Sequence, residues 1–288
     1  MYHSKKLHEK GIIRNRKMLT QSQYGDYKFV GHLDHIKTFH ACIKSLCFGE
    51  NGTVTFSEEG LRITVEQGKS IQATLFMDPK FFAEYHVKDL TSFGLKLNVF
   101  AECLSLFGVM DCSVKMLYKG DGAPLIVLLE PHNDDDVSTE CAIKTLHVDE
   151  PIEYELDENS ASLNVIFMRG PDLFNIFNEL DKAAEELEFT LSPQRPHFKI
   201  ATVGVVQAES TVEVAKSSDM ILLFNCRDTT VARYKSQQLR LMNKALQAAT
   251  KVAIKTDASG LLEMHFMMQS GDAEEIYVQF FLTPLLDI

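Results

Sequence analysis

Apolar and polar residues alternate along short segments through most of the chain, beginning at residue 27. Alternation with a period of two is typical of β-strands that bury one face. It predicts strands over residues 27–33, 53–56, 61–65, 71–75, 93–97, 113–118, 125–129, 137–146, 163–167, 188–191, 198–202, 211–214, 220–225, 251–256, 261–267 and 276–282. Strands therefore dominate the predicted fold.

Four short segments instead repeat their apolar residues with the helical period of about 3.6, which gives each predicted helix one apolar face. Asp34 is a candidate N-cap of the first helix, Gly108 is a candidate stop for the second, and Pro171 fits the first turn of the third. The apolar stripes are Ile36, Phe39, Ile43 and Leu46; Val99, Phe100, Cys103, Leu104 and Phe107; Leu173, Ile176, Phe177 and Leu180; and Leu239, Met242, Leu246 and Ala249. Each helix is expected to lie on a sheet and to expose its opposite face.

The predicted elements repeat in four blocks, each a strand, a short helix and further strands, which indicates two similar halves. Matching residues are separated by a slowly changing offset: Phe39 and Phe174 are 135 positions apart, and Val114 and Val252 are 138 apart. We predict two domains at residues 27–148 and 161–288. The acidic segment 149–160 is predicted to be an extended linker between them.

The 288 residues are 45% hydrophobic, so the chain can bury a large core, and no apolar run reaches the length of a membrane span. The six cysteines have no CxxC spacing and are interpreted as reduced thiols. The formal net charge of −11 disfavours a nucleic-acid-binding protein, because such proteins are usually basic overall, but a local basic face can coexist with an acidic exterior. Residues 1–26 form a basic stretch without apolar periodicity and are predicted to be a disordered tail.

Two similar halves, each with two strand–helix–strand blocks, resemble the sliding-clamp superfamily, whose best-known member is the proliferating cell nuclear antigen. Several stretches are similar to the Rad-one family of subunits of the DNA-damage checkpoint clamp. They are Gly31-His32-Leu33-Asp34, Gly60-Leu61-Arg62-Ile63-Thr64-Val65-Glu66, Ile71-Gln72-Ala73, Glu102-Cys103-Leu104-Ser105-Leu106-Phe107-Gly108 and Ala232-Arg233-Tyr234-Lys235. The resemblance implies an α+β, PCNA-like fold with two similar β-rich domains, each carrying two short helices on its inner face.

The resemblance also implies a function without catalysis and without a cofactor. The chain would be one subunit of a heterotrimer with Rad-nine and Hus-one type subunits, the nine-one-one clamp. A clamp loader would place this ring around double-stranded DNA at damage in the nucleus, where it would serve as a scaffold for checkpoint and repair proteins. No nucleotide-binding GxxxxGK[ST] or GxGxxG loop is present in the sequence.

Two of the predicted helices carry basic and polar residues opposite their apolar stripes. The residues are Lys37, His40 and Lys44 on the first helix, and Arg240, Lys244 and Gln247 on the fourth. If the apolar faces pack on the sheets, these faces point into the hole of the ring. They are expected to contact phosphates without reading bases.

Family resemblance also implies two kinds of partner contact. Segments 137–146 and 207–214 are expected to pair with neighbouring subunits through Thr139, Cys141, Ile143, Thr211, Val212 and Val214, although both could be ordinary strands paired within the chain. A client-binding groove is expected under the acidic linker. Its expected residues are Val65, Glu66, Gln67, Phe281, Leu282, Thr283 and Pro284.

Alternative interpretations remain open at this stage. One is a homotrimeric replication-type clamp, which is disfavoured because the second and third helices carry Glu102, Glu179 and Asp181 beside a lone Lys182. Another is a metal-dependent 3′–5′ exonuclease that uses the run 134–136, which is better interpreted as a solvated turn. A metal site at His32, His35 and His40 has poor ligand spacing.

Overall fold

The computed structural model describes residues 25–107, 112–132, 137–157, 163–204, 209–270 and 274–286. The predicted tail, apart from its last two residues, lies outside this part of the chain, as do Gly108 and the acidic run 134–136.

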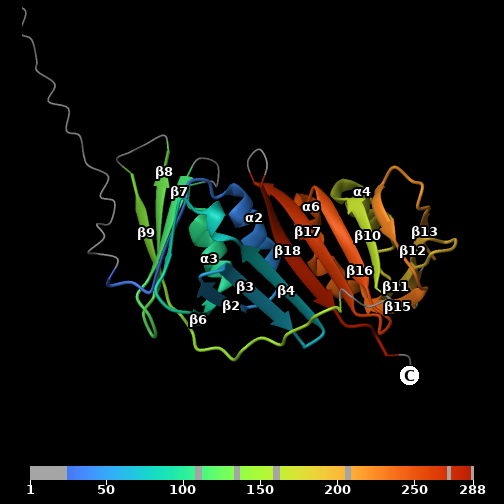
Figure 1. The fold of residues 1–288 in the computed structure, drawn as a ribbon, viewed down its shortest axis with the longest axis horizontal. Coiled ribbons are helices and arrows are strands. Elements are labelled where there is room, and N and C mark those ends of the chain that lie inside the picture. The colour runs from blue at the N-terminus through green and yellow to red at the C-terminus, as the bar shows by residue number, and fades with distance from the viewer. Residues whose placement is uncertain are drawn as a thin grey trace, which may run out of the picture.

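The first half follows the predicted order of elements closely (Figure 1). Its elements are β1 (Phe29–Leu33), α2 (Lys37–Leu46), β2 (Asn51–Ser57), β3 (Gly60–Gln67), β4 (Ile71–Met77), the 3-10 turn η1 (Pro79–Phe81), β5 (Glu84–Val87), β6 (Thr91–Lys96), α3 (Leu97–Leu104), β7 (Cys112–Tyr118), β8 (Leu125–Pro131) and β9 (Thr139–Ile143).

The second half repeats this order without a counterpart of the 3-10 turn. Its elements are β10 (Asn164–Arg169), α4 (Gly170–Glu179), β11 (Glu186–Leu191), β12 (Phe198–Val203), β13 (Thr211–Val214), β14 (Ile221–Asn225), β15 (Thr230–Lys235), α5 (Ser236–Leu241), α6 (Asn243–Ala248), β16 (Lys251–Thr256), β17 (Leu262–Ser270) and β18 (Glu274–Leu282).

Three details of the helices differ from the predictions. The residue before α2 is Ile36, and no side chain caps the helix, so Asp34 is not its N-cap. Val99 was expected in the buried stripe but is 40% exposed, because the short helix α3 buries only one narrow face. The predicted fourth helix is broken at Met242, whose amide donates to the carbonyl of Leu239, so that α5 and α6 are separate.

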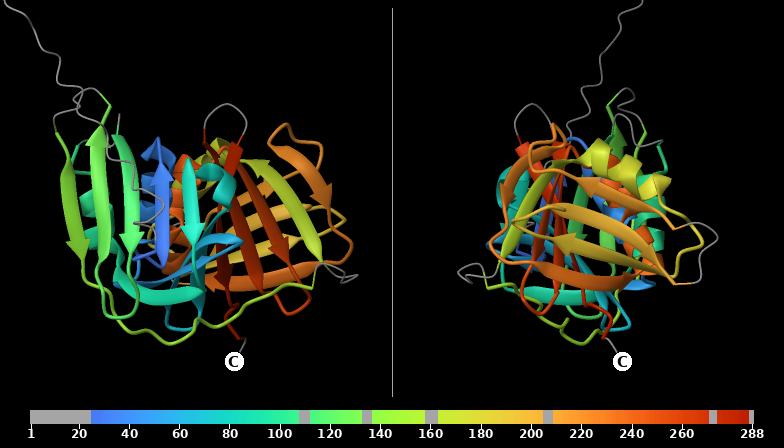
Figure 2. Two further views of the ribbon diagram at one scale, coloured as in Figure 1. Left: turned by 60° about the vertical axis from the view of Figure 1, so that its left-hand side comes forward. Right: turned by 90° about the vertical axis from the view of Figure 1, so that its right-hand side faces the viewer.

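The described strands form three antiparallel sheets made from two kinds of unit. A five-strand unit occurs twice, as β5-β1-β7-β8-β9 and as β14-β10-β16-β17-β18; a four-strand unit also occurs twice, as β4-β3-β2-β6 and as β13-β12-β11-β15. The pairing of β18 with β4 joins one copy of each unit into a central nine-stranded sheet. We call this joint the seam. Figures 1 and 2 show the helices gathered behind the central sheet and the other two units standing at its ends.

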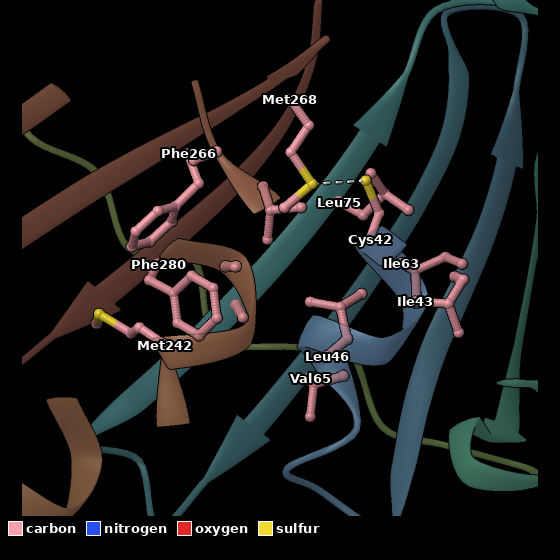
Figure 3. Close-up of a cluster of buried hydrophobic side chains, with 14 of the residues drawn as sticks. Cys42, Ile43, Leu46, Ile63, Val65, Leu75, Met242, Phe266, Met268 and Phe280 are labelled. Atoms are coloured by element: carbon pink, nitrogen blue, oxygen red, sulfur yellow. Dashed lines mark hydrogen bonds between the residues drawn. The ribbon is translucent and has the colours of Figure 1, made fainter. Parts of the chain in front are cut away.

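The hydrophobic core runs continuously through both halves and across the seam. Cys42 and Leu46 of α2 point toward Leu75 of β4, and the sulfur of Cys42 lies 3.4 Å from that of Met268 in β17 (Figure 3). Phe280 of β18 is fully buried in the same cluster. Burying a side chain of this size contributes roughly 1.5–3 kcal/mol, so the seam is a strong junction between the halves.

Candidate DNA-binding and partner-binding surfaces

The predicted basic faces of α2 and α6 are only partly present. Lys37, Lys44, Lys244 and Gln247 are exposed on these helices. Arg240 of α5 is half-buried, since its guanidinium donates to the Ser236 hydroxyl at 3.2 Å and to the Asp181 carbonyl at 3.1 Å. The break at Met242 thus separates the environment of Arg240 from that of Lys244.

Lys44 and Lys244 come from different halves but line one hollow between α2, α3 and α6, with a volume of about 500 Å³. Neither lysine forms an ion pair with another residue in the part of the chain that the structure describes. Burial raises the pKa of the nearby Cys47 thiol, against the opposing effect of Lys244 and Lys44. Glu102 also lines the hollow, so its charge is mixed.

His40 was expected to share the exposed face with Lys37 and Lys44, and this expectation is wrong. The side chain is 5% exposed, and its Nε2 lies 2.8 Å from the Ser105 hydroxyl beside α3. Burial lowers the pKa of His40, and the charge of Lys44 lowers it further. At about 100° per residue, position 40 is turned from Lys37 toward the apolar stripe, and α3 covers it there.

The two strands that were expected to meet neighbouring subunits are both edge strands. In the described residues β9 pairs only with β8, and β13 pairs only with β12. Each is therefore paired within the chain on one side and open on the other. Ile143 and Val214 are buried, whereas Thr139, Cys141 and Val212 are half-exposed and Thr211 is exposed.

The acidic linker crosses the outer face of the central sheet and is fixed to it by specific contacts. The Glu66 carboxylate accepts a hydrogen bond from the Ile152 amide at 2.8 Å and another from the Gln72 side chain. The Tyr154 hydroxyl donates to the Lys69 carbonyl at 2.8 Å, and its ring stacks on Phe281. A groove of about 580 Å³ lies beside residues 151–155 of the linker.

Only one of the predicted groove residues lines this groove, and that residue is Phe281. Glu66 fixes the linker, while Val65 and Leu282 are buried in the core because successive strand residues point to opposite faces. The remaining predicted residues do not line the groove; they are Gln67, Thr283 and Pro284. The sequence analysis did not predict the floor of the groove, which is mostly polar. The signal for it was the alternation of polar residues along β2, β3 and β4. The floor residues on these strands are Thr55, Arg62, Thr64, Gln72, Thr74 and Phe76.

A buried charge cluster lies on the same outer face. Glu263 of β17 is 4% exposed and accepts from the Gln279 amide at 2.9 Å, with Lys255 at 3.5 Å and His265 in direct contact. Burial alone would raise the pKa of Glu263, but these hydrogen bonds and charges outweigh it and hold the pKa below its ordinary value.

The three histidines considered as metal ligands point in different directions. His32 lies 3.8 Å from Asp34, His35 faces the ring of His132, and His40 contacts Ser105. Among the described residues, no group of three His, Cys, Asp or Glu side chains is placed to hold one metal ion. No helix of the described chain is long and apolar enough to cross a membrane.

Comparison with known proteins gives a consistent match. A family described as "Repair protein Rad1/Rec1/Rad17" matches residues 28–268. "DNA repair protein Rad1" of Drosophila melanogaster is 62% identical over 266 residues, which are 92% of this chain and 97% of that protein. "Cell cycle checkpoint protein RAD1" of Homo sapiens is 31% identical over 270 residues, 92% of this chain and 94% of the human protein. "DNA damage checkpoint control protein rad1" of Schizosaccharomyces pombe is 22% identical over 279 residues, 87% and 84% of the two chains.

Proposed function

This chain belongs to the Rad1 family and has its PCNA-like clamp fold, and from this we infer that it is one subunit of a heterotrimeric checkpoint clamp that encircles DNA. Its partners are Rad-nine and Hus-one type subunits, and a clamp loader places the ring at damaged DNA in the nucleus. The chain itself has no catalytic role. It provides a surface on which checkpoint and repair proteins assemble.

The arrangement of strands carries this proposal. Within the chain, one five-strand unit and one four-strand unit join at β18 and β4 to form a continuous sheet. The remaining five-strand unit ends at the open β9, and the remaining four-strand unit ends at the open β13. Head-to-tail joining of such edges between subunits repeats the same junction and closes a ring if the rotation is right. It also removes both edges from solvent.

The helix faces support a DNA-facing role. Lys37, Lys44 and Lys244 are exposed cations on helices that cover one face of the central sheet. Lysine contacts phosphates as a point charge and reads no base, so binding of this kind is sequence-independent and weakened by salt. A small number of such contacts suits a ring that must slide.

Assembly with partners tests the subunit assignment. The purified chain is mixed with Rad-nine and Hus-one type subunits, and light scattering is combined with hydrogen exchange. We expect a complex containing one copy of each, with amide exchange slowed in both β9 and β13. A complex that forms while both strands exchange at the rate of the free chain contradicts the assignment of these edges.

The groove beside the linker is proposed to bind client peptides. Phe281 lines it and stacks on Tyr154, so Phe281→Ala removes both groove wall and linker support. We expect a peptide with the usual clamp-binding motif to bind the trimer at least about tenfold more weakly after this change, a loss of about 1.4 kcal/mol. The control is Leu90→Ala, because Leu90 is exposed between β5 and β6, outside the groove lining. Equal binding to wild type and Phe281→Ala argues against this groove.

A further inference from the structure

The floor of the groove beside the linker is made of outward-facing side chains from β2, β3, β4 and β18. In one row across the first three strands, Thr55 lies opposite Arg62, and Arg62 lies opposite Phe76. In the next row, Thr64 lies opposite Thr74. Residues directly opposite each other in antiparallel strands share one face of the sheet, so both rows face the same space for a ligand.

Several polar groups of this floor already have partners within the sheet. The hydroxyls of Thr64 and Thr74 lie 3.1 Å apart in a shared hydrogen bond. The side-chain amide of Gln279 donates to the Glu263 carboxylate at 2.9 Å. Polar groups that satisfy one another can be covered by a ligand at little cost, so these residues shape the floor more than they select what binds there.

Arg62 differs from these neighbours. Its side chain is exposed and forms no hydrogen bond or ion pair with another residue in the part of the chain that the structure describes. An arginine side chain keeps its charge in proteins and presents its N–H donors in a planar fork that fits a carboxylate. Arg62 is therefore a cation in the groove floor whose donors are free for a ligand.

Any segment that fills the groove removes water from the Arg62 guanidinium. A charged group that loses its water without gaining a partner carries a large desolvation penalty. An entirely apolar segment would therefore bind poorly over Arg62. A carboxylate would instead pair with the guanidinium, and the attraction is stronger in a groove partly enclosed by the linker than in open water. The groove thus favours a segment that brings an acidic side chain to Arg62.

The walls of the groove carry the opposite charge. Glu59 lies in the turn between β2 and β3, and Glu153 and Glu155 belong to the linker; all three line the groove and are exposed. Acidic walls attract basic segments and disfavour acidic ones. A segment of uniform charge is therefore mismatched with either the floor or the walls, whereas a single acidic residue between basic residues matches both.

We propose that Arg62 determines which client segments this groove accepts. The groove takes an extended segment with one aspartate or glutamate whose carboxylate pairs with Arg62, and with lysine or arginine on both sides of that residue facing the acidic walls. This inference rests on the proposed client groove and adds the chemistry of the segment that it selects.

Selection of peptides on the assembled clamp tests the proposal. Short random peptides displayed on phage are selected against clamps that contain the wild-type chain, Phe281→Ala, Arg62→Gln or Arg227→Gln. Peptides that bind wild type and are lost with Phe281→Ala are the groove binders, and we expect them to share one acidic residue between basic ones. Arg62→Gln should remove the preference for the acidic residue and keep the preference for the basic ones. Arg227→Gln should change neither, because Arg227 is exposed after β14 and lies outside the groove lining.

A charge swap separates a direct ion pair from a structural role of Arg62. For one selected peptide, we expect Arg62→Gln to weaken binding about tenfold or more. Replacing the acidic residue of the peptide by glutamine should have the same effect, and the two changes together should add little. Arg62→Glu should recover affinity when the peptide carries lysine in place of its acidic residue.

Two results overturn the proposal: groove binders that share no acidic residue, and a selected peptide that binds wild type and Arg62→Gln with equal affinity. A selection in which no peptide depends on Phe281 counts against the groove itself, and so against both the proposed function of the groove and the role of Arg62.

Discussion

At the scale of single residues, the buried carboxylate of Glu263 is the feature with the clearest pH dependence. It is enclosed on the outer face of the central sheet by His265, Lys255 and Gln279. Removing one partner from a buried charge pair leaves the other charge uncompensated and costs roughly 3–5 kcal/mol. The cluster therefore contributes to stability only while Glu263 is ionised.

We predict that Glu263→Gln lowers the free energy of unfolding by about 3 kcal/mol at neutral pH. Because the folded-state pKa of Glu263 is lowered, its contribution is fully present above the unfolded-state value of about 4.3 and is lost as the pH falls through the folded-state value. Urea unfolding of wild type and variant across this range should therefore show a difference that shrinks in acid. A difference that is independent of pH, or no difference at neutral pH, contradicts this interpretation. Glu58→Gln in an exposed turn is the control.

Many residues were assigned to the correct face from the sequence, and the errors had two sources: an assignment by family resemblance against the strand alternation, and burial of a side chain by a neighbouring helix. Phe281 was expected in the groove and lines it. Val65 and Leu282 were assigned to the groove from family resemblance, yet strand alternation alone puts them on the core face. For His40 the helix pattern leaves the side chain at the border of the polar face, and the packing of α3, which sequence does not give, buries it.

At the scale of elements, the apolar stripes predicted all four helical segments, and alternation predicted most strands. Two strands were missed for different reasons. β5 has no regular alternation of burial. β15 does alternate, but it buries Thr230, Ala232 and Tyr234 and exposes Val231, so its apolar residues do not fall on one face. The last helix is divided into α5 and α6 at the buried Met242, and this division separates Arg240 from Lys244.

This division leads to a prediction about DNA binding. In the assembled clamp, Lys44→Ala/Lys244→Ala should reduce the dependence of DNA retention on salt, by about 0.9 in the log–log slope for each phosphate that the ring no longer neutralises. Arg240→Ala should have a smaller effect, because the guanidinium is already bonded to Ser236 and Asp181. Retention is measured over a series of salt concentrations. The control is Lys88→Ala/Lys119→Ala, which changes exposed lysines just after β5 and β7. If the control variant lowers the salt slope of DNA retention by the same amount, the helix face has no special role in DNA binding.

At the scale of the whole molecule, duplication explains both the internal seam and the two open edges. The order of elements in the sequence predicted two similar halves, and the structure adds how they join: the five-strand unit of the second half pairs with the four-strand unit of the first. The sequence could not give this pairing, because β4 and β18 lie about 200 residues apart. We propose that the same pairing, made between the open edges of neighbouring subunits, closes the ring.

The most direct test of the ring uses the topology of the DNA. The chain is assembled with its two partner subunits, loaded onto nicked circular DNA by the clamp loader, and washed at raised salt. We predict that the complex stays on the circle, is lost when the DNA is cut once, and is retained again when both new ends are blocked by bound protein. Equal retention on circular and cut DNA would contradict the claim that this chain forms part of a ring around DNA.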